Sequence, residues 1–228
     1  MKTAKPITVL LAEDHVVVRE GLCSLLNADG NFRVVAETRT GREAVELTLA
    51  LRPDVVLMDI AMPVLNGLEA TKQILATDPS AKVLILSAYS DDEYVLRTSA
   101  AGAAGFLEKQ TSAAILTKAI HEVAKGNTFY SPTITKSLLK HEHNPRNRAG
   151  MEKVNVTRLT SRESEVLQLV AEGSTNRQIG ADLGISVKTV EKHRQHIMDK
   201  LNIHDTAGLT RFAIATGVIE NNVRLTIV

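Results

Sequence analysis

Three carboxylates stand at the carboxyl ends of two apolar segments that lie far apart in the sequence. Asp59 ends the run Val55–Met58, and the adjacent Glu13 and Asp14 follow the run Ile7–Ala12. Short apolar runs with β-branched residues are typical of strands buried on both faces of a parallel sheet. Ligands of such sheets bind outside the carboxyl ends of the strands. If the first strand is central and borders the third, the three acids share one crevice.

A crevice lined by three carboxylates predicts a divalent cation. Like charges at close range raise one another's pKa unless a cation neutralises them. Mg²⁺ prefers octahedral oxygen ligands and keeps several of its waters. We therefore predict an Mg²⁺ site formed by Glu13, Asp14 and Asp59, with the backbone carbonyl of Ala61 as a further ligand.

A hydroxyl and an ammonium group are expected at the same edge of the sheet, because Ser87 and Lys109 end two later apolar segments. A carboxylate is a known covalent acceptor of phosphoryl groups, and a metal ion with a lysine neutralises the phosphoryl oxygens during transfer. The combination predicts that Asp59 carries a phosphoryl group. Taken singly, Asp59 and Ser87 could instead cap the turns that follow them, and Lys109 could simply be solvated.

The elements that hold these side chains alternate between strand and helix. The segments predicted as strands are 7–12, 32–37, 55–59, 82–87 and 106–109. The segments predicted as helices are 15–26, 41–51, 67–77, 92–101 and 112–125. This alternation predicts an α/β, flavodoxin-like, doubly wound parallel sheet of five strands and five helices, with right-handed crossovers, over residues 5–126.

The stretch 127–156 is predicted to be a linker. Its second half is polar and carries His, Asn, Arg, Pro and Gly without periodicity. Residues 133–139 are the one part that could form a short helix. His141 and His143 could form a metal pair, but no further Cys or His stands at ligand spacing, so a solvated linker is the better interpretation.

Residues 157–220 are predicted to form a small all-α domain of four helices. Thr160 with Glu163, and Thr175 with Gln178, have the spacing of capping boxes that open two successive helices. These helices are expected to end near residues 172 and 183, and two more are predicted at 187–201 and 205–216. Two capped helices and a tight turn before a third helix indicate a helix-turn-helix motif.

The predicted helix 187–201 is the candidate DNA-reading element, with Val187, Val190, Ile197 and Leu201 on one face and charged residues on the other. Helix-turn-helix geometry places such a helix in the major groove. The candidates for base contact are Lys188, Lys192 and Gln195, because Lys can read guanine and Gln adenine. The candidates for phosphate contact are Thr189 and His193. An amphipathic surface helix whose charged face is only solvated is the alternative.

Composition limits the classes of function. The net charge of +1 is far from the basic balance of an obvious nucleic-acid binder, so the DNA interpretation rests on the motif. A single cysteine excludes an internal disulfide and favours a reducing, cytoplasmic location. Nothing resembles a signal peptide, and no apolar stretch approaches the roughly 18 residues of a membrane span, so no membrane partner is expected.

The first domain resembles the receiver domain of bacterial two-component response regulators. The resemblance spans residues 5–126 and rests on Glu13-Asp14, Asp59 with Met62-Pro63 and Gly67, Ser87-Ala88, and Lys109. It implies that Asp59 takes phosphate from a sensor histidine kinase, that Ser87 swings to the phosphate, and that Phe106 turns inward as a switch. Many receivers have Tyr at this last position, so a switch contact of Phe106 must be packing. Gln110 stands where a carboxylate is common.

The second domain is similar to the LuxR-type DNA-binding domain, through residues 159–167, 189–193 and 201–202. Together with the receiver, the chain is identified as a member of the NarL/FixJ class of response regulators. Membership implies a transcription factor that binds double-stranded promoter DNA and forms a homodimer when phosphorylated, with helix 205–216 pairing two DNA-binding domains. Glu191 departs from a frequent basic residue, and it either reads cytosine or faces away from the phosphates.

Two other functions fit part of this pattern. Some phosphatases use a strand-end aspartate as nucleophile, but they need a second acid two residues later, where this chain has Ala61, so no enzyme is expected. A DNA binder that needs no phosphate is the other alternative. Intact Asp59, Glu13, Asp14 and Lys109 argue against it, and failure to take up label from a phosphodonor would favour it.

Overall fold

The computed structural model describes residues 5–88, 92–130 and 159–219. The chain divides into two compact units, 1–148 and 149–228. The predicted helix 133–139 and the residues His141 and His143 lie outside the described residues. Within the described ranges, no helix combines the length and the apolar character needed to cross a bilayer.

The first unit contains a five-stranded parallel sheet with the order β2-β1-β3-β4-β5. Its strands are β1 (Ile7–Ala12), β2 (Phe32–Thr38), β3 (Val55–Asp59), β4 (Val83–Ser87) and β5 (Gly105–Glu108). The predicted flavodoxin-like order is confirmed, and β1 lies directly beside β3. The carboxyl ends of these two strands, where the three acids stand, are therefore neighbours.

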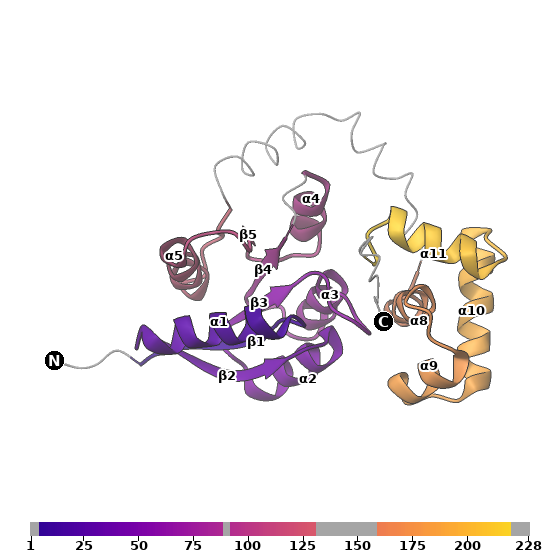
Figure 1. Ribbon diagram of the computed structural model, residues 1–228, viewed down its shortest axis with the longest axis horizontal. Coiled ribbons are helices and arrows are strands. Elements are labelled where there is room, and N and C mark those ends of the chain that lie inside the picture. Colours follow the sequence, from indigo (N-terminus) through magenta and orange to yellow (C-terminus); the bar gives the residue numbers. More distant parts are fainter. Residues whose placement is uncertain (1–4, 89–91, 131–158, 220–228) are drawn as a thin grey trace. The chain divides into compact units, whose positions relative to one another are not determined.

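Five helices cover the two faces of this sheet (Figure 1). They are α1 (Val16–Ala28), α2 (Gly41–Leu51), α3 (Gly67–Thr77), α4 (Asp92–Ala100) and α5 (Ala113–Ala124). Helices α1 and α5 pack on one face, while α2, α3 and α4 pack on the other. The side chains of Thr40, Asn66 and Ser112 cap α2, α3 and α5, because each accepts a hydrogen bond from a backbone N–H group in the first turn of its helix.

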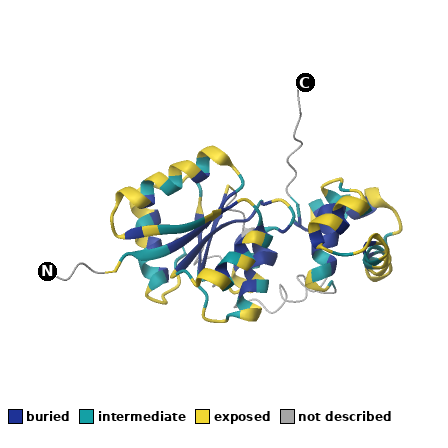
Figure 2. Cartoon of the chain, turned by 90° about the horizontal axis from the view of Figure 1, so that it is seen from below, coloured by how far each residue is buried: buried dark blue, intermediate teal, exposed yellow. Residues whose placement is uncertain are grey.

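Successive side chains along each strand point to opposite faces of the sheet and so contribute to two separate apolar cores. On β1, Leu10 belongs to the core under α2, α3 and α4, while Val9 and Leu11 belong to the core under α1 and α5. Every residue of β3 and β4 is buried, which fits strands covered on both faces (Figure 2). The rigid strands thus hold the side chains at their ends in fixed positions.

The packing of the first unit continues past the predicted boundary at residue 126. The backbone N–H of Phe129 donates to Ala104, and the carbonyl of Phe129 accepts from Phe106, so residue 129 lies along the edge of β5. The hydroxyl of Tyr130 donates to the carbonyl of Ala103 over 3.0 Å. Residues 127–130, predicted as the start of the linker, are therefore attached to the sheet.

In the described residues of the second unit, all regular secondary structure is α-helical. Its helices are α8 (Ser161–Ala171), α9 (Asn176–Leu183), α10 (Val187–Leu201) and α11 (Thr206–Ala215). Both predicted capping boxes are present, at Thr160 with Glu163 and at Thr175 with Gln178. The turn between α9 and α10 runs through Gly184, whose φ of 63° suits glycine, to Ser186, which caps α10.

Candidate functional site

Glu13, Asp14 and Asp59 meet at the carboxyl end of the sheet, as the sequence predicts. Ala12 at the end of β1 pairs with Met58 of β3, so the residues that follow each of them are side by side. Glu13 and Asp59 are almost wholly buried, with 0% and 1% of their surfaces exposed. The ligand atoms of these acids and of His15 lie within 4.8 Å of one another. We call this group the acid pocket.

Lys109 supplies a cation to the acid pocket. Its Nζ atom lies 2.8 Å from Oε2 of Glu13 and 2.9 Å from Oδ2 of Asp59. The strand β5 ends at Glu108, one residue earlier than predicted, and the backbone N–H of Lys109 donates to the carbonyl of Ser87 over 2.8 Å. This bond anchors Lys109 to the end of β4 and directs its side chain across β4 to the acids.

Burial and neighbouring acids shift the protonation of the acid pocket. Burial, reinforced by the charge of Glu13, raises the pKa of Asp59 from 3.8 to about 6, against the opposing effect of Lys109. Burial alone lowers the pKa of Lys109, but the charges of Asp59 and Glu13 outweigh it and leave that pKa above its ordinary value. Asp59 is thus mostly ionised at neutral pH, and Lys109 remains charged.

Two residues of the acid pocket, His15 and Arg19, were not predicted from the sequence. The Nδ1 atom of His15 lies 2.8 Å from Oδ1 of Asp14 and 3.0 Å from Oε1 of Glu13. Arg19, which is 6% exposed, donates from Nη1 to the carbonyl of Glu13 over 2.9 Å and so holds the backbone of the acid pair. The adjacency of His15 to the two acids was a visible signal, and the position of Arg19 one turn into α1 was a weaker one.

The loop after Asp59 is held tightly against the strand. The backbone N–H of Gly67 donates to the carbonyl of Ile60 over 2.8 Å. A Cβ atom at Gly67 would lie 1.9 Å from the carbonyl oxygen of Asp59, so only glycine fits there. Val64 in the same loop has φ of 69°, an uncommon conformation for a β-branched residue. Ala61, the predicted carbonyl ligand, lies in this loop and is half-buried.

Ser87 and Phe106 stand close to the acid pocket along the sheet. Asp59 pairs with Leu86, so Ser87 lies one residue further at the end of the neighbouring strand. Ser87 is 1% exposed, and Phe106 is 0% exposed in the core under α2, α3 and α4. In this structure the ring of Phe106 already points inward.

The donor set of the acid pocket can bind a metal ion. The three carboxylates share the ammonium group of Lys109, while the guanidinium of Arg19 contacts the carbonyl of Glu13 and the carboxylate of Glu37, so negative charge is in excess unless a further cation enters. Carboxylate oxygens suit hard divalent ions, whereas the imidazole of His15 also suits transition metals. The residues present therefore fit a divalent cation.

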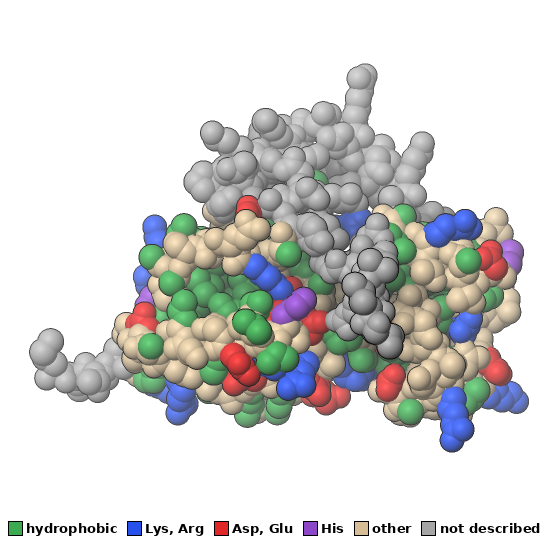
Figure 3. Space-filling model, viewed as in Figure 1, with side chains coloured by type: hydrophobic (Ala, Val, Ile, Leu, Met, Phe, Trp, Pro, Cys, Tyr) green, Lys and Arg blue, Asp and Glu red, His purple; other side chains and the backbone are tan. Residues whose placement is uncertain are grey.

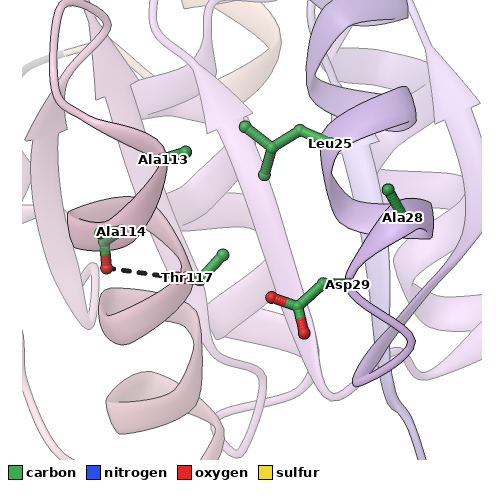
Figure 4. A pocket seen from close by; sticks show the side chains of 6 residues that line it. All are labelled: Leu25, Ala28, Asp29, Ala113, Ala114 and Thr117. Carbon is green, nitrogen blue, oxygen red and sulfur yellow. Dashed lines mark hydrogen bonds between the residues drawn. The ribbon is translucent and has the colours of Figure 1, made fainter.

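An open hollow of about 370 Å³ lies between α1 and α5 (Figure 4). These two helices cover the face of the sheet opposite to α3. Leu25 and Ala28 of α1 and Asp29 just after it line one side, and Ala113, Ala114 and Thr117 of α5 line the other. Figure 3 shows hydrophobic side chains gathered between these helices. Asp29 is its only carboxylate, so the hollow has no set of metal ligands and is separate from the acid pocket.

Helix α10 has the bounds predicted for the DNA-reading helix. Its buried face differs from the predicted apolar face at one residue, Val187. Val190 and Ile197 of α10 are fully buried, but Val187 is 42% exposed. Lys188, Lys192 and Gln195 are exposed. The exposed face of α10 is thus wider at its start than the apolar pattern indicates.

The two predicted phosphate contacts on α10 are both half-buried. The hydroxyl of Thr189 lies 2.8 Å from that of Ser186, the N-cap. Burial, helped by the charge of Arg162, lowers the pKa of His193, so its imidazole is neutral at neutral pH. His193 can therefore offer a neutral N–H group, not a charge.

Three polar contacts fix α10 against the rest of its unit. Arg194 donates to Asn176 on α9 and to Thr206 on α11, each over 3.0 Å. Lys200 donates to both carboxylate oxygens of Glu163, at 2.9 and 2.6 Å, and so ties the end of α10 to the start of α8. The exposed face of α10 is therefore presented by a rigid support.

Comparisons with known proteins agree with this geometry. The family described as "Response regulator receiver domain" matches residues 9–121, and "Bacterial regulatory proteins, luxR family" matches residues 157–213. The chain is 37% identical over 225 residues to the transcriptional regulatory protein DegU of Brevibacillus brevis, covering 94% of this chain and 95% of that protein. It is 40% identical over 200 residues to LiaR of Bacillus subtilis, covering 87% and 92%.

A solved structure gives the same result for the fold. The two-component response regulator of the LuxR family from Aurantimonas sp. SI85-9A1 is 31% identical, with a TM-score of 0.57 over 61% of this chain and 100% of that one. The two family matches fall on the two units of this chain, and the two relatives are matched over most of their own length. The chain therefore belongs to the two-component response regulators, as a transcription regulator that joins a receiver domain to a LuxR-type helix-turn-helix domain.

Proposed function

We propose that a sensor histidine kinase phosphorylates Asp59 and that this event controls binding of the second domain to promoter DNA. The convergence of Glu13, Asp14, Asp59 and Lys109 in one pocket carries the proposal. Burying Glu13 and Asp59 next to Asp14 destabilises the fold, because like charges repel one another and burial disfavours the charged form, so a functional role accounts for the cluster better than a structural one.

Each group of the acid pocket has a defined task in phosphoryl transfer. Glu13, Asp14 and Asp59 would hold Mg²⁺ together with the carbonyl of Ala61, and the bound ion would neutralise charge on the transferred group. Asp59, ionised at neutral pH, forms the new P–O bond while the P–N bond to the kinase histidine breaks. Lys109 moves from Asp59 to the phosphoryl oxygens.

The phosphorylated state is transmitted through the end of β4. A phosphoryl group adds about −1.5 to −2 charges at Asp59 and three strong acceptors. The hydroxyl of Ser87 donates to it, and the void that Ser87 leaves is filled by movement of Phe106 and α4. Because Phe106 is already buried, the change is a repacking inside the core and not a swing from solvent.

The second domain reads promoter DNA with α10. Lys188, Lys192 and Gln195 face base edges, while Thr189 and His193 contact phosphates. Phosphorylation favours a homodimer in which α11 pairs two DNA-binding domains. Two half-sites would then lie about one helical turn apart.

The limits of the two domains and their cellular setting complete the proposal. We assign residues 5–126 to the receiver domain and residues 157–220 to the DNA-binding domain. Residues 127–156 form the linker, of which residues 127–130 are attached to the edge of the receiver sheet. The chain acts in the cytoplasm, where DNA and a cytoplasmic kinase domain are both accessible. It does not turn over phosphate esters, because Ala61 stands where a second acid would be needed.

Asp59→Asn tests the proposal directly. Wild type and variant are incubated with Mg²⁺ and a small phosphodonor, and phosphoryl uptake and affinity for promoter duplexes are measured. We expect wild type alone to take up one phosphoryl group and to bind DNA more tightly afterwards. Glu46→Gln, at an exposed position on α2, is the matched control and should behave as wild type. An equal gain in affinity for wild type and Asp59→Asn would remove Asp59 from the mechanism.

A further inference from the structure

Glu191 is an exposed carboxylate on the helix that the proposed function assigns to DNA. It lies on α10 between Lys188 and Gln195. These neighbours stand at the three- and four-residue spacings at which helix side chains can pair. Gln195 instead donates to Asp199 over 2.8 Å, and within the described residues Glu191 makes no hydrogen bond or ion pair. Its carboxylate is thus available to a partner outside the chain.

The position of Glu191 on the helix places it among the base-reading residues. At about 100° per residue, Glu191 lies about 60° from Lys188 and about 40° from Gln195. The buried residues Val190 and Ile197 fix the orientation of the helix, and they lie about 100° and 120° from Glu191, which therefore stands at the edge of the exposed face. A helix that turns Lys188 and Gln195 to the bases therefore turns Glu191 there as well.

A carboxylate on this face weakens DNA binding unless a donor meets it. The phosphates repel it, so an acid that only pointed to the backbone would lower affinity for every sequence. An ionised carboxylate can only accept hydrogen bonds. Guanine and thymine present only acceptors in the major groove. Adenine presents its N6 amino group beside the acceptor N7, which repels a carboxylate and suits the amide of Gln or Asn. Cytosine presents its N4 amino group, the donor that Glu accepts from.

We propose that Glu191 accepts a hydrogen bond from the N4 amino group of a cytosine, and so specifies a C·G pair in each half-site. This inference rests on the proposed role of α10 as the DNA-reading helix. The carboxylate also excludes competing sequences, because a guanine or thymine edge at that point would set acceptor against acceptor. Glu191 thus determines specificity at the expense of overall affinity.

The experiment uses the full chain, incubated with Mg²⁺ and a small phosphodonor, and a pool of random-sequence DNA duplexes that is sequenced before and after selection. Wild type is expected to enrich a motif with one fixed C·G pair in each half-site. Glu191→Ala should lose the preference at that pair and keep the rest of the motif. Measured on single duplexes, its discrimination there should fall about tenfold or more. Glu191→Gln should shift the preferred base from cytosine to adenine.

Asp182→Ala is the matched control, because it removes the same charge from an exposed position on α9, outside the DNA-reading face. It should leave the motif unchanged. If Glu191→Ala enriches the wild-type motif and binds all duplexes more tightly by one common factor, Glu191 only repels phosphates and the inference fails. If wild type enriches no motif, both the proposed function and this inference are contradicted.

Discussion

The ammonium group of Lys109 lies 2.9 Å from Oδ2 of Asp59, although 49 positions separate the two residues in the chain. The same ammonium group lies 2.8 Å from Oε2 of Glu13, so one cation bridges two buried acids from β1 and β3. The charge of Lys109 lowers the pKa of Asp59 against the opposing effects of burial and Glu13, and so favours the ionised acid. Lys109 therefore acts both on the resting acid and on the group that the acid receives.

Lys109→Gln should slow phosphorylation of Asp59 by at least about tenfold. The substitution removes a charge that lowers the pKa of Asp59, and it removes the neutralising partner of the phosphoryl oxygens. The phosphorylated fraction is followed over time with a small phosphodonor and Mg²⁺. Lys118→Gln, exposed on α5, is the control and should leave the rate unchanged. Equal rates for Lys109→Gln and wild type would contradict the assigned role.

Without metal, the receiver should lose stability as pH rises from 4 to 7. The pKa of Asp59 is about 6 in the folded state and near 3.8 when unfolded, so folding favours the protonated acid. The stability from this group is present below pH 4 and is lost as pH rises through 6, by about 3 kcal/mol. Urea unfolding in a chelator, at constant ionic strength, measures it.

Asp59→Asn provides the comparison for this pH dependence. The amide does not titrate, so the variant should lack the decrease between pH 4 and 7. Added Mg²⁺ should stabilise wild type at pH 7, because a ligand of the folded state alone raises stability by mass action. The same pH dependence in both proteins would show that Asp59 is not the titrating group.

Glu163→Gln should destabilise the DNA-binding domain by about 2 kcal/mol. Glu163 accepts from Thr160 in a capping box and from Lys200 at 2.6 Å. Burial raises the pKa of Glu163, but the hydrogen bonds from Lys200 and Thr160 outweigh this and leave it below 4.5. Its stabilising effect is therefore present above pH 4.5 and is lost as pH falls below it.

Thermal unfolding of wild type and Glu163→Gln across pH 3 to 7 tests this prediction. The two proteins should converge at the acid end, because the carboxylate is then protonated in both states of wild type. Asp182→Asn, an exposed acid on α9, is the control and should show no such difference. A constant difference between wild type and Glu163→Gln over the whole range would exclude an ionic contribution.

Gly67→Ala should disrupt the loop that follows Asp59. The added Cβ would lie 1.9 Å from the carbonyl oxygen of Asp59, so the backbone must move, at a cost of about 3 kcal/mol or more. Gly21→Ala is the matched control: nothing lies within 4 Å of its added Cβ on α1, and the change should stabilise that helix by about 1 kcal/mol. Chemical denaturation of both variants provides the measurement, and equal stabilities would contradict the steric argument.

Local signals in the sequence predicted local structure well. The spacing of Thr160 and Glu163 indicated a capping box because both partners lie within one helical turn, and the box is present. The bounds of α3 and α10 were predicted correctly, since Pro79 follows shortly after the end of α3 and Ser186 caps the start of α10. Asp59 and the acid pair were found because strand order places their carboxyl ends together.

Contacts between distant parts of the chain were not predictable in the same way. Arg19 sits under the acid pair only because α1 packs against β1 and β2, which no local pattern reveals. Val187 is exposed although it lies beside the apolar face, since helical angles do not show where the neighbouring helices end. The attachment of Phe129 to β5 depends on an open sheet edge, which the residues around Phe129 do not show.

We expect the pairing of Phe129 with β5 to hinder edge-to-edge association of the sheet. β5 is the outermost strand of the sheet, and an unpaired strand edge is a template for pairing with another molecule. Phe129 occupies part of this template with its own N–H and C=O groups. A receiver fragment that stopped at residue 126 would leave the edge bare and would be expected to aggregate. A fragment that ran to residue 130 would keep it shielded, so the place of truncation determines solubility.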